Sequence, residues 1–313
     1  MRRLGRASVP EGGAQAPHTL VVSAWNGGFF SHVNRVVNHL HHSLGGNGCE
    51  AIRVDWRVGE HIPLFIYGTE RDGELWRHFF EPLDFPEAPA TERFTWEYAD
   101  LSMTGLHAYR MYKRGDRWRT IYGRAFDEHV RVREGIRRRV LEIWKDGGDP
   151  RHAIGVHYRH PGHDHECPRA SPPLEVFIER TRRLLGSNRS TLVVLATDVH
   201  EALEAFRAEF GERLLVQPNV VRAGMEEDQD DYGAIPSVKL GEQALIDVLL
   251  LARCEALLHV VSNIATAVGY INPRLRMVYC EPWPLGVAAT LHARLTPSRR
   301  ATLEGVSRPA RHG

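Results

Sequence analysis

The pattern of hydrophobic positions is most regular in the second half of the chain, where short apolar runs alternate with longer amphipathic segments. Apolar runs bounded by turn residues are typical of buried strands, and apolar residues three or four apart predict helices. This alternation predicts a parallel sheet covered by helices. The predicted strands are 153–158, 191–197, 213–217, 256–261 and 276–280, and the predicted helices are 172–185, 200–210, 242–253 and 264–271.

The first half begins with a similar unit and then becomes irregular. A strand over 19–25 leads through a glycine turn into a helix from Ser31 to Gly45, and a second strand follows over 51–56. Between 59 and 123, prolines and aromatic residues interrupt the pattern, and we assign no element there. A helix is then predicted over 124–144.

The length of 313 residues is enough for two domains. The turn residues Lys145-Asp-Gly-Gly-Asp-Pro150 separate the irregular half from the regular one. We therefore expect a flexible arm over 1–17, an N-terminal α/β domain over 18–150 and a C-terminal Rossmann-like domain over 151–313.

Charge and cysteine usage exclude several classes of protein. Forty Lys and Arg against 39 Asp and Glu give a formal charge of +1, so no overall field favours nucleic acid or an anionic membrane. The four cysteines are scattered, and the N-terminus lacks the apolar core of a secretory signal. No run of about 18 apolar residues predicts a membrane span. We expect a cytoplasmic protein that binds no nucleic acid, has no transmembrane segment and builds any anion site locally.

Candidate functional residues stand where the predicted strands end. In a doubly wound parallel sheet, ligands bind outside the carboxyl ends of the strands. The side chains at these ends are His157, Arg159, His160, Asp198, Ser262 and Asn263. Asp247 lies in the helix before the strand 256–261, and Gly28 lies in the turn after the first strand of the chain.

The chemistry of these residues suits a phosphorylated ligand. The forked guanidinium of Arg159 can bind two phosphate oxygens at once. A helix that begins after Ser262 and Asn263 offers unpaired N–H groups and a partial positive charge to the same anion. Each residue alone also has a simpler interpretation, because Asp198, Ser262 and Asn263 are common helix caps. Only their combination predicts a site.

The same segments resemble the α-1,6-fucosyltransferase family, especially its bacterial nodulation-type members. Gly155-Val-His-Tyr-Arg-His160 is similar to the family's H-x-R-[RH] motif, and Thr197-Asp198 is similar to its ATD strand end. The segment 244–254, ALIDVLLLARC, resembles the family's ALIDMYLLARC, and Val261-Ser-Asn-Ile264 stands where the family has a Ser-containing turn. A fainter similarity joins the turn 26–32 to a Gly-rich strand-to-helix turn of the superfamily.

The resemblance implies two Rossmann-like domains facing a cleft, which is the GT-B type of glycosyltransferase fold. It also implies an inverting, metal-independent transfer of fucose from GDP-fucose to a hydroxyl of a saccharide or glycoconjugate, with no cofactor beyond the donor. His157 and Asp247 would face the guanine, and Asp198 would lie near the nucleotide. The N-terminal domain would receive the acceptor. The oligomeric state is not predicted.

The catalytic base is less well defined than the donor site. The transfer needs a general base for the acceptor hydroxyl. By resemblance this base is Glu166, which lies close to where the family carries a Glu after its Arg motif, and Asp164 is a competing candidate. His160 stands where the eukaryotic relatives commonly have Arg, so it is not a permanently charged phosphate ligand.

The histidine-rich stretch 157–167 also supports a different interpretation. Its density of His, Glu and Cys is typical of zinc or iron sites, as in a metal-dependent hydrolase. The spacing is not that of HExxH, Pro161-Gly162 interrupts it, and the chain contains 18 histidines. We therefore predict no metal site. A metal-dependent hydrolase and a nucleotide-sugar-binding protein without turnover remain alternatives.

Overall fold

The C-terminal half of the protein is built on a five-stranded parallel sheet in the order β6-β5-β4-β7-β8. Its strands are β4 (Ala153–Tyr158), β5 (Leu192–Thr197), β6 (Leu214–Val216), β7 (Ala256–His259) and β8 (Arg276–Tyr279). The structure, a computed structural model, describes residues 16–24, 27–46, 48–57, 74–95, 116–145, 152–159, 172–186, 191–222, 235–260 and 262–280.

Helices cover both faces of this sheet because alternate strand residues are apolar on each side. Ile154, Val156 and Tyr158 of β4 pack on the face covered by α6 (Leu174–Leu185) and α7 (His200–Phe210). Ala153 and Gly155 face α8 (Ser237–Leu251) and α9 (Asn263–Ile271). The approach is close at Gly155, where a Cβ would lie 3.0 Å from Cδ2 of the Leu251 side chain. The short helix η4 (Gly211–Arg213) joins α7 to β6.

All the predicted elements of this half are present, and the boundaries differ most at α8. This helix begins at Ser237 rather than at 242, directly after Pro236. A proline is tolerated at the start of a helix because the first N–H groups have no helical partner there. The added first turn contains Gly241, which lies so close to Phe79 and Phe29 that a Cβ would be 2.6 Å from Phe79 Cζ.

The N-terminal half contains a smaller parallel sheet in the order β2-β1-β3. Strands β1 (His18–Ser23) and β2 (Cys49–Asp55) flank α1 (Phe29–His42), as the sequence pattern predicts. Strand β3 (Glu92–Thr95) was not predicted. It forms because it pairs with β1, a contact between segments far apart in sequence that local periodicity does not record. A short helix, α2 (Trp76–Phe79), precedes it.

The single helix predicted over 124–144 is wrong. The structure has α4 (Asp116–His129) and α5 (Glu134–Trp144), separated by an extended turn. Val132 in this turn forms an antiparallel bridge with Phe80, and the Arg133 N–H donates to Phe79 O at 3.0 Å. These backbone hydrogen bonds compete with helix continuation, so the helix is divided by a contact from the segment around α2.

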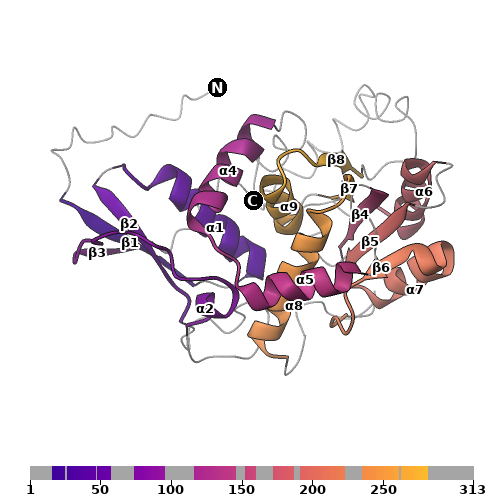
Figure 1. The fold of residues 1–313 in the computed structure, drawn as a ribbon, viewed down its shortest axis with the longest axis horizontal. Coiled ribbons are helices and arrows are strands. Elements are labelled where there is room, and N and C mark those ends of the chain that lie inside the picture. The colour runs from indigo at the N-terminus through magenta and orange to yellow at the C-terminus, as the bar shows by residue number, and fades with distance from the viewer. Residues whose placement is uncertain are drawn as a thin grey trace, which may run out of the picture.

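The two sheets lie at opposite ends of an elongated molecule, and helices α1, α4, α8 and α9 fill the space between them (Figure 1). One hydrophobic cluster extends through these helices from one sheet to the other. The domain boundary near 150 stays a prediction. No helix in the described ranges combines the length and apolar character of a membrane span. The cluster includes Val22 and Val54 from the first sheet, Val33, Tyr122, Leu245 and Val268 from the helices, and Val194 and Leu257 from the second sheet.

Candidate functional site

The strand order places a topological switch point between β4 and β7. From β4 the chain winds outward through β5 and β6, and then returns to the other side of β4 through β7 and β8. The connections leaving the carboxyl ends of β4 and β7 therefore diverge, and the crevice between them is the ordinary ligand site of such a sheet. Arg159 follows β4, and Ser262 and Asn263 follow β7.

His157 and Arg159 occupy the β4 side of this crevice. His157 is buried, with 4% of its surface exposed, and strand alternation places it on the α8 face with Gly155. Arg159 follows directly after the strand and is partly exposed. The structure therefore buries the His157 imidazole and leaves Arg159 partly exposed.

Asp247, in α8, lies toward the same carboxyl ends of the strands. This helix runs antiparallel to the strands, because it connects β6 to the parallel strand β7. Leu251 lies against Gly155, so Asp247, one helical turn earlier, is displaced toward the carboxyl ends. Burial raises the pKa of Asp247 to about 7, while the nearby charge of Arg222 lowers it and that of Asp198 raises it. Asp198, Asp247 and Arg222 therefore belong to one electrostatic cluster.

Arg222 is a member of this cluster that sequence reasoning missed. Burial lowers the pKa of its guanidinium, and the charges of Asp247 and Asp198 oppose that effect. Its Nη1 donates to Val220 O at 3.2 Å, whereas its buried Nε has no hydrogen-bond partner among the described residues. The signal that could have revealed it is its position shortly after β6, because the same strand-end argument selected Asp198 after β5.

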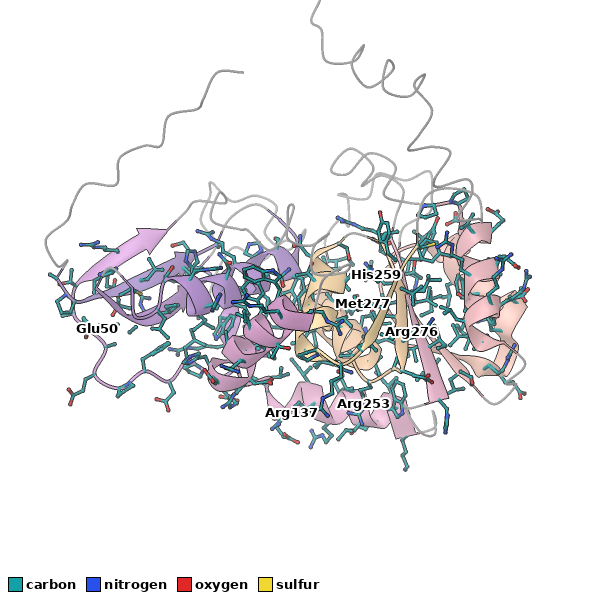
Figure 2. The ribbon with its side chains drawn as sticks, turned by 90° about the horizontal axis from the view of Figure 1, so that it is seen from above. Glu50, Arg137, Arg253, His259, Arg276 and Met277 are labelled. Carbon is teal, nitrogen blue, oxygen red and sulfur yellow. The ribbon has the colours of Figure 1, made fainter. Side chains whose placement is uncertain are left out.

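Ser262 and Asn263 begin α9 on the β7 side of the crevice. The Ser262 hydroxyl accepts the Ala265 N–H at 3.0 Å, so Ser262 is a helix cap. The N–H groups of Asn263 and Ile264 donate to no acceptor in the described part of the chain. Figure 2 shows the direction in which β7 runs: Arg253, just before the strand, and His259, its last residue, lie toward opposite ends of the strand. The start of α9 follows the carboxyl end of β7, where His259 lies.

Two side chains from the N-terminal half hold α9 in place. Asn34 of α1 donates from Nδ2 to Asn263 O and to Asn263 Oδ1, each at 3.1 Å. At the other end, buried Arg119 of α4 donates to Gly269 O at 2.9 Å, Asn272 O at 2.9 Å and Leu275 O at 2.6 Å. A cation at this end also opposes the negative pole of the helix. Neither contact was predicted from the sequence.

His259 is a buried histidine of β7 that sequence reasoning also missed. Its side chain is fully buried, and its Nδ1 lies 3.0 Å from Val260 O. Desolvation lowers the pKa of the imidazole to about 4. His259 is therefore neutral near pH 7 and adds no positive charge to the crevice.

Gly28 lies at the carboxyl end of β1, where it caps α1. The predicted start of this helix at Ser31 is too late in the sequence, because the helix begins at Phe29 and the Ser31 hydroxyl donates back to Gly28 O at 2.5 Å. Gly28 precedes Asn34 by six positions, about 9 Å along a helix axis. The residue of α1 that contacts the start of α9 is therefore Asn34, more than one turn beyond Gly28.

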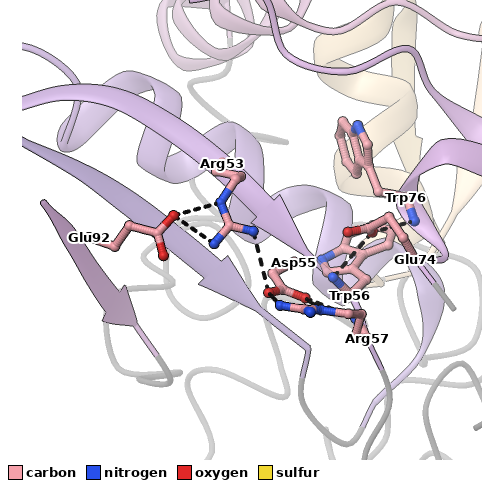
Figure 3. A network of polar contacts seen from close by, with 7 residues as sticks. All are labelled: Arg53, Asp55, Trp56, Arg57, Glu74, Trp76 and Glu92. Carbon is pink, nitrogen blue, oxygen red and sulfur yellow. Dashed lines mark hydrogen bonds and ion pairs between the residues drawn. The ribbon is translucent and has the colours of Figure 1, made fainter. Parts of the chain in front are cut away.

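The carboxyl end of β2 is occupied by its own ion pairs (Figure 3). Asp55 accepts hydrogen bonds from Arg57 Nε at 2.8 Å and from Arg53 Nη1 at 3.5 Å. The hydrogen bond from Arg57 holds the pKa of Asp55 below its ordinary value. Nearby, Glu74 Oε1 accepts the N–H groups of Trp56 and Trp76 at 3.3 and 3.1 Å. Because Asp55 is already paired with these arginines, it is a poor proton acceptor.

The remaining predicted residues, His160, Asp164 and Glu166, lie outside the described residues, as do His163, His165 and Cys167. Within the described ranges, no group of three or more His, Cys, Asp or Glu side chains could hold a metal ion. The base assignment and the metal alternative for 157–167 stay predictions.

The chain has the fold of a GT-B-type fucosyltransferase. Among solved structures it is similar to the fucosyltransferase NodZ from Bradyrhizobium, with 15% identity and a TM-score of 0.50 over 83% of this chain and 94% of that chain. NodZ α-1,6-fucosyltransferase co-crystallised with GDP gives a TM-score of 0.51 at 15% identity, over 83% and 94% of the two chains. The same enzyme soaked with GDP-fucose gives 0.50 at 16% identity, over 82% and 93%. No family model and no curated protein sequence matches the chain.

Proposed function

We propose that this protein is a glycosyltransferase that moves fucose from GDP-fucose to a hydroxyl of a saccharide or glycoconjugate, with inversion and without a metal ion. The observation that supports the proposal is the topology: Arg159 follows β4 and α9 follows β7, and these two neighbouring strands form the switch point of the sheet. The structural neighbour NodZ has been crystallised with GDP and soaked with GDP-fucose, which supports the choice of donor.

The two sides of the crevice suit a diphosphate. As the sugar leaves, negative charge grows on the diphosphate and needs preorganised donors. Arg159 supplies a permanent charge with a bidentate fork, and the N–H groups of Asn263 and Ile264 supply aligned dipoles. Together these donors would perform the charge stabilisation that a divalent metal provides in other transferases.

The cluster around Asp247 suits a guanine base. Guanine presents two adjacent N–H donors and a neighbouring carbonyl oxygen. A carboxylate can accept both donors in parallel, as it does from the fork of arginine. Arg222 is a cation available for an acceptor beside them. Neither uracil nor adenine offers two adjacent ring-edge donors in this pattern, so Asp247 favours GDP over UDP or ADP.

The proposed reaction is a single displacement at C1 of fucose. The acceptor oxygen forms a bond to C1 from the face opposite the diphosphate, and the bond from C1 to the β-phosphate oxygen breaks. GDP leaves with the bonding electron pair, and the acceptor proton passes to a carboxylate base, Glu166 or Asp164. The N-terminal half would receive the acceptor. A cytoplasmic location is part of the proposal, and the buried thiols of Cys49, Cys254 and Cys280 are compatible with a reducing compartment.

The proposal is tested first by nucleotide binding. Isothermal titration with GDP, UDP and ADP is done with and without EDTA on the wild type, Arg159→Ala, Arg159→Lys and the surface control Arg183→Ala. Wild type should prefer GDP regardless of EDTA, and Arg159→Ala should weaken GDP binding about tenfold or more, the usual effect of losing a charge-assisted hydrogen bond. Arg159→Lys should be intermediate, because it retains the charge and loses the fork. Arg183→Ala should match wild type.

Transfer is tested separately with radiolabelled GDP-fucose and a panel of oligosaccharide acceptors. Labelled saccharide product in EDTA supports the full proposal. GDP binding with neither transfer nor donor hydrolysis identifies a binding protein instead of an enzyme. Preference for another nucleotide overturns the donor assignment, and the absence of any nucleotide binding overturns the whole proposal.

A further inference from the structure

A buried amide joins the N-terminal half to the candidate donor site. Asn34 is fully buried in α1. Its Oδ1 accepts the Tyr270 hydroxyl at 3.1 Å, and its Nδ2 donates to the backbone oxygen and to Oδ1 of Asn263, each at 3.1 Å. Both the nitrogen and the oxygen of the Asn34 amide are therefore engaged.

This pattern fixes which way the Asn34 amide points. Burial raises the pKa of the Tyr270 hydroxyl, so it stays protonated and donates. Asn34 must then direct its oxygen toward Tyr270 and its nitrogen toward Asn263. A reversed amide would place two donors together at Tyr270 and two acceptors together at Asn263, which leaves buried groups unsatisfied.

The orientation of Asn34 in turn fixes the orientation of Asn263. Because Oδ1 of Asn263 receives a hydrogen bond from Asn34, its Nδ2 points elsewhere. That nitrogen donates to no acceptor in the described ranges, and it is not one of the buried side-chain nitrogens that lack a partner there. It stands at the start of α9 beside the backbone N–H groups of Asn263 and Ile264. All these donors belong to one helix end.

We infer that Asn34 is a positioning residue: it turns the Asn263 side-chain amide so that its N–H groups, and not its oxygen, face the diphosphate of the donor. This inference rests on the proposed function, because it assumes an anion at the start of α9. Asn34 itself does not touch the nucleotide. Through it, the N-terminal half determines whether the C-terminal half presents a donor or an acceptor to the phosphate.

The test compares GDP with guanosine, which lacks the diphosphate. Asn34→Leu removes all three hydrogen bonds at similar volume, and should weaken GDP binding about tenfold while guanosine binding changes less than about twofold. Asn34→Asp keeps the acceptor for Tyr270 but replaces the donor toward Asn263 by a second acceptor. The Asn263 amide should then turn its Nδ2 toward position 34 and its Oδ1 toward the phosphate. This variant should weaken GDP binding more than Asn34→Leu does. The matched control is Asn38→Leu, one turn later in α1. It removes the contact of Asn38 with the Tyr122 hydroxyl and leaves the contact of Asn34 with α9 in place.

Coupling between the two asparagines decides the mechanism. Asn263→Ala should weaken GDP binding as much as Asn34→Leu does, and the double variant should bind no more weakly than Asn263→Ala alone, because both changes remove one interaction. Additive losses overturn the inference, as does an equal loss for guanosine. Tyr270→Phe, which frees the Asn34 oxygen without changing the volume of the core, is a milder variant with the same expected direction.

The outcome for wild type separates this inference from the proposed function. A wild-type protein that binds no GDP overturns both. If wild type binds GDP and Asn34→Leu binds it equally well, only the role of Asn34 is overturned. Guanosine affinity and the melting temperature serve as measures of folding. A variant in which both are lowered is replaced in the comparison by Tyr270→Phe.

Discussion

At the scale of single residues, Asp247 is a carboxyl group of the candidate site whose environment opposes its charge. Burial raises the pKa of its carboxyl to about 7 from an ordinary value of 3.8. Arg222 lowers that pKa and Asp198 raises it, and no hydrogen bond from a described residue compensates the carboxylate. A group in this state gains most from a ligand that brings its own donors, as guanine does.

Asp247 should make GDP binding dependent on pH. Only the ionised carboxylate accepts two N–H donors, so affinity should rise between about pH 6 and 8, by about tenfold for a pKa near 7. The ratio of wild-type to Asp247→Asn affinities isolates this effect, because ionisation of the phosphate is common to both. Protonation of a histidine would strengthen diphosphate binding at low pH, which is the opposite sign. A ratio that is constant across this range would exclude Asp247 as the base-binding group.

Without ligand, the same carboxyl should reduce stability as pH rises. Its pKa in the folded protein is raised above its unfolded value, so the protonated form is favoured in the folded state. The resulting stabilisation is complete below about pH 4 and is lost as pH rises through about 7. Asp247→Asn should remove this dependence in chemical denaturation measured over the same pH range.

The candidate site was only partly predictable from sequence, for reasons visible at this scale. His157, Arg159, Asp198, Ser262 and Asn263 are predicted because each stands at a strand end, a position that periodicity locates, and as site residues they stay predictions. Arg222 lies beyond a short strand in an irregular segment. Asn34 carries its function through a residue 229 positions away. A buried amide inside an apolar helix gives no local signal for that partner.

At the scale of elements, the packing of α4 on α9 depends on a glycine. A Cβ at Gly123 would lie 2.5 Å from Tyr270 O and 3.0 Å from Pro273 Cγ. The first of these atoms belongs to the backbone and cannot turn aside. The close approach allows Arg119, one turn earlier in α4, to reach the carbonyl groups at the end of α9.

Gly123→Ala should therefore destabilise the protein by about 1–3 kcal/mol, the usual cost of overpacking a core contact. Gly135 is the matched control, since it lies in α5 and a Cβ there meets nothing within 4 Å. Gly135→Ala should be neutral or stabilise by up to about 1 kcal/mol, because alanine has the higher helix propensity. Both values come from urea denaturation. Equal effects of the two substitutions would show that α4 adjusts freely against α9.

The elements themselves were more predictable in the C-terminal half than in the N-terminal half. Strands such as β4 and β5 are buried on both faces, so their apolar runs are continuous and flanked by turns. The break between α4 and α5 has a different origin. It depends on pairing between Val132 and Phe80, and a helical pattern continues through it. Local patterns identify the element type where burial is uniform and fail where a distant strand or turn intervenes.

At the scale of the whole molecule, the two sheets share a hydrophobic core. Residues from both sheets and from the helices between them belong to one cluster, which includes Val22, Leu245 and Leu257. Gly241 of α8 adds a close contact with Phe79 and Phe29 of the N-terminal half. The C-terminal half is therefore built against the N-terminal half over a broad apolar surface.

Unfolding should consequently be a single cooperative transition, despite the length of the chain. Differential scanning calorimetry should give one peak with agreement between calorimetric and van't Hoff enthalpies. Tryptophan fluorescence and far-ultraviolet circular dichroism should change together. Two separated transitions would instead favour two independently stable domains divided near 150.

The two contacts that hold α9 differ in a way that bears on how the protein can change over evolution. Arg119 binds carbonyl oxygens, which every residue type carries, so its acceptor positions can vary in sequence without losing the contact. Asn34, Asn263 and Tyr270 are joined through side chains, and each change requires a compensating change in another. Among homologues, positions 34, 263 and 270 should covary, whereas position 119 should show no covariation with 269 and 275. A chimera that exchanges the N-terminal half alone should fail at this three-residue contact unless both sides are exchanged together.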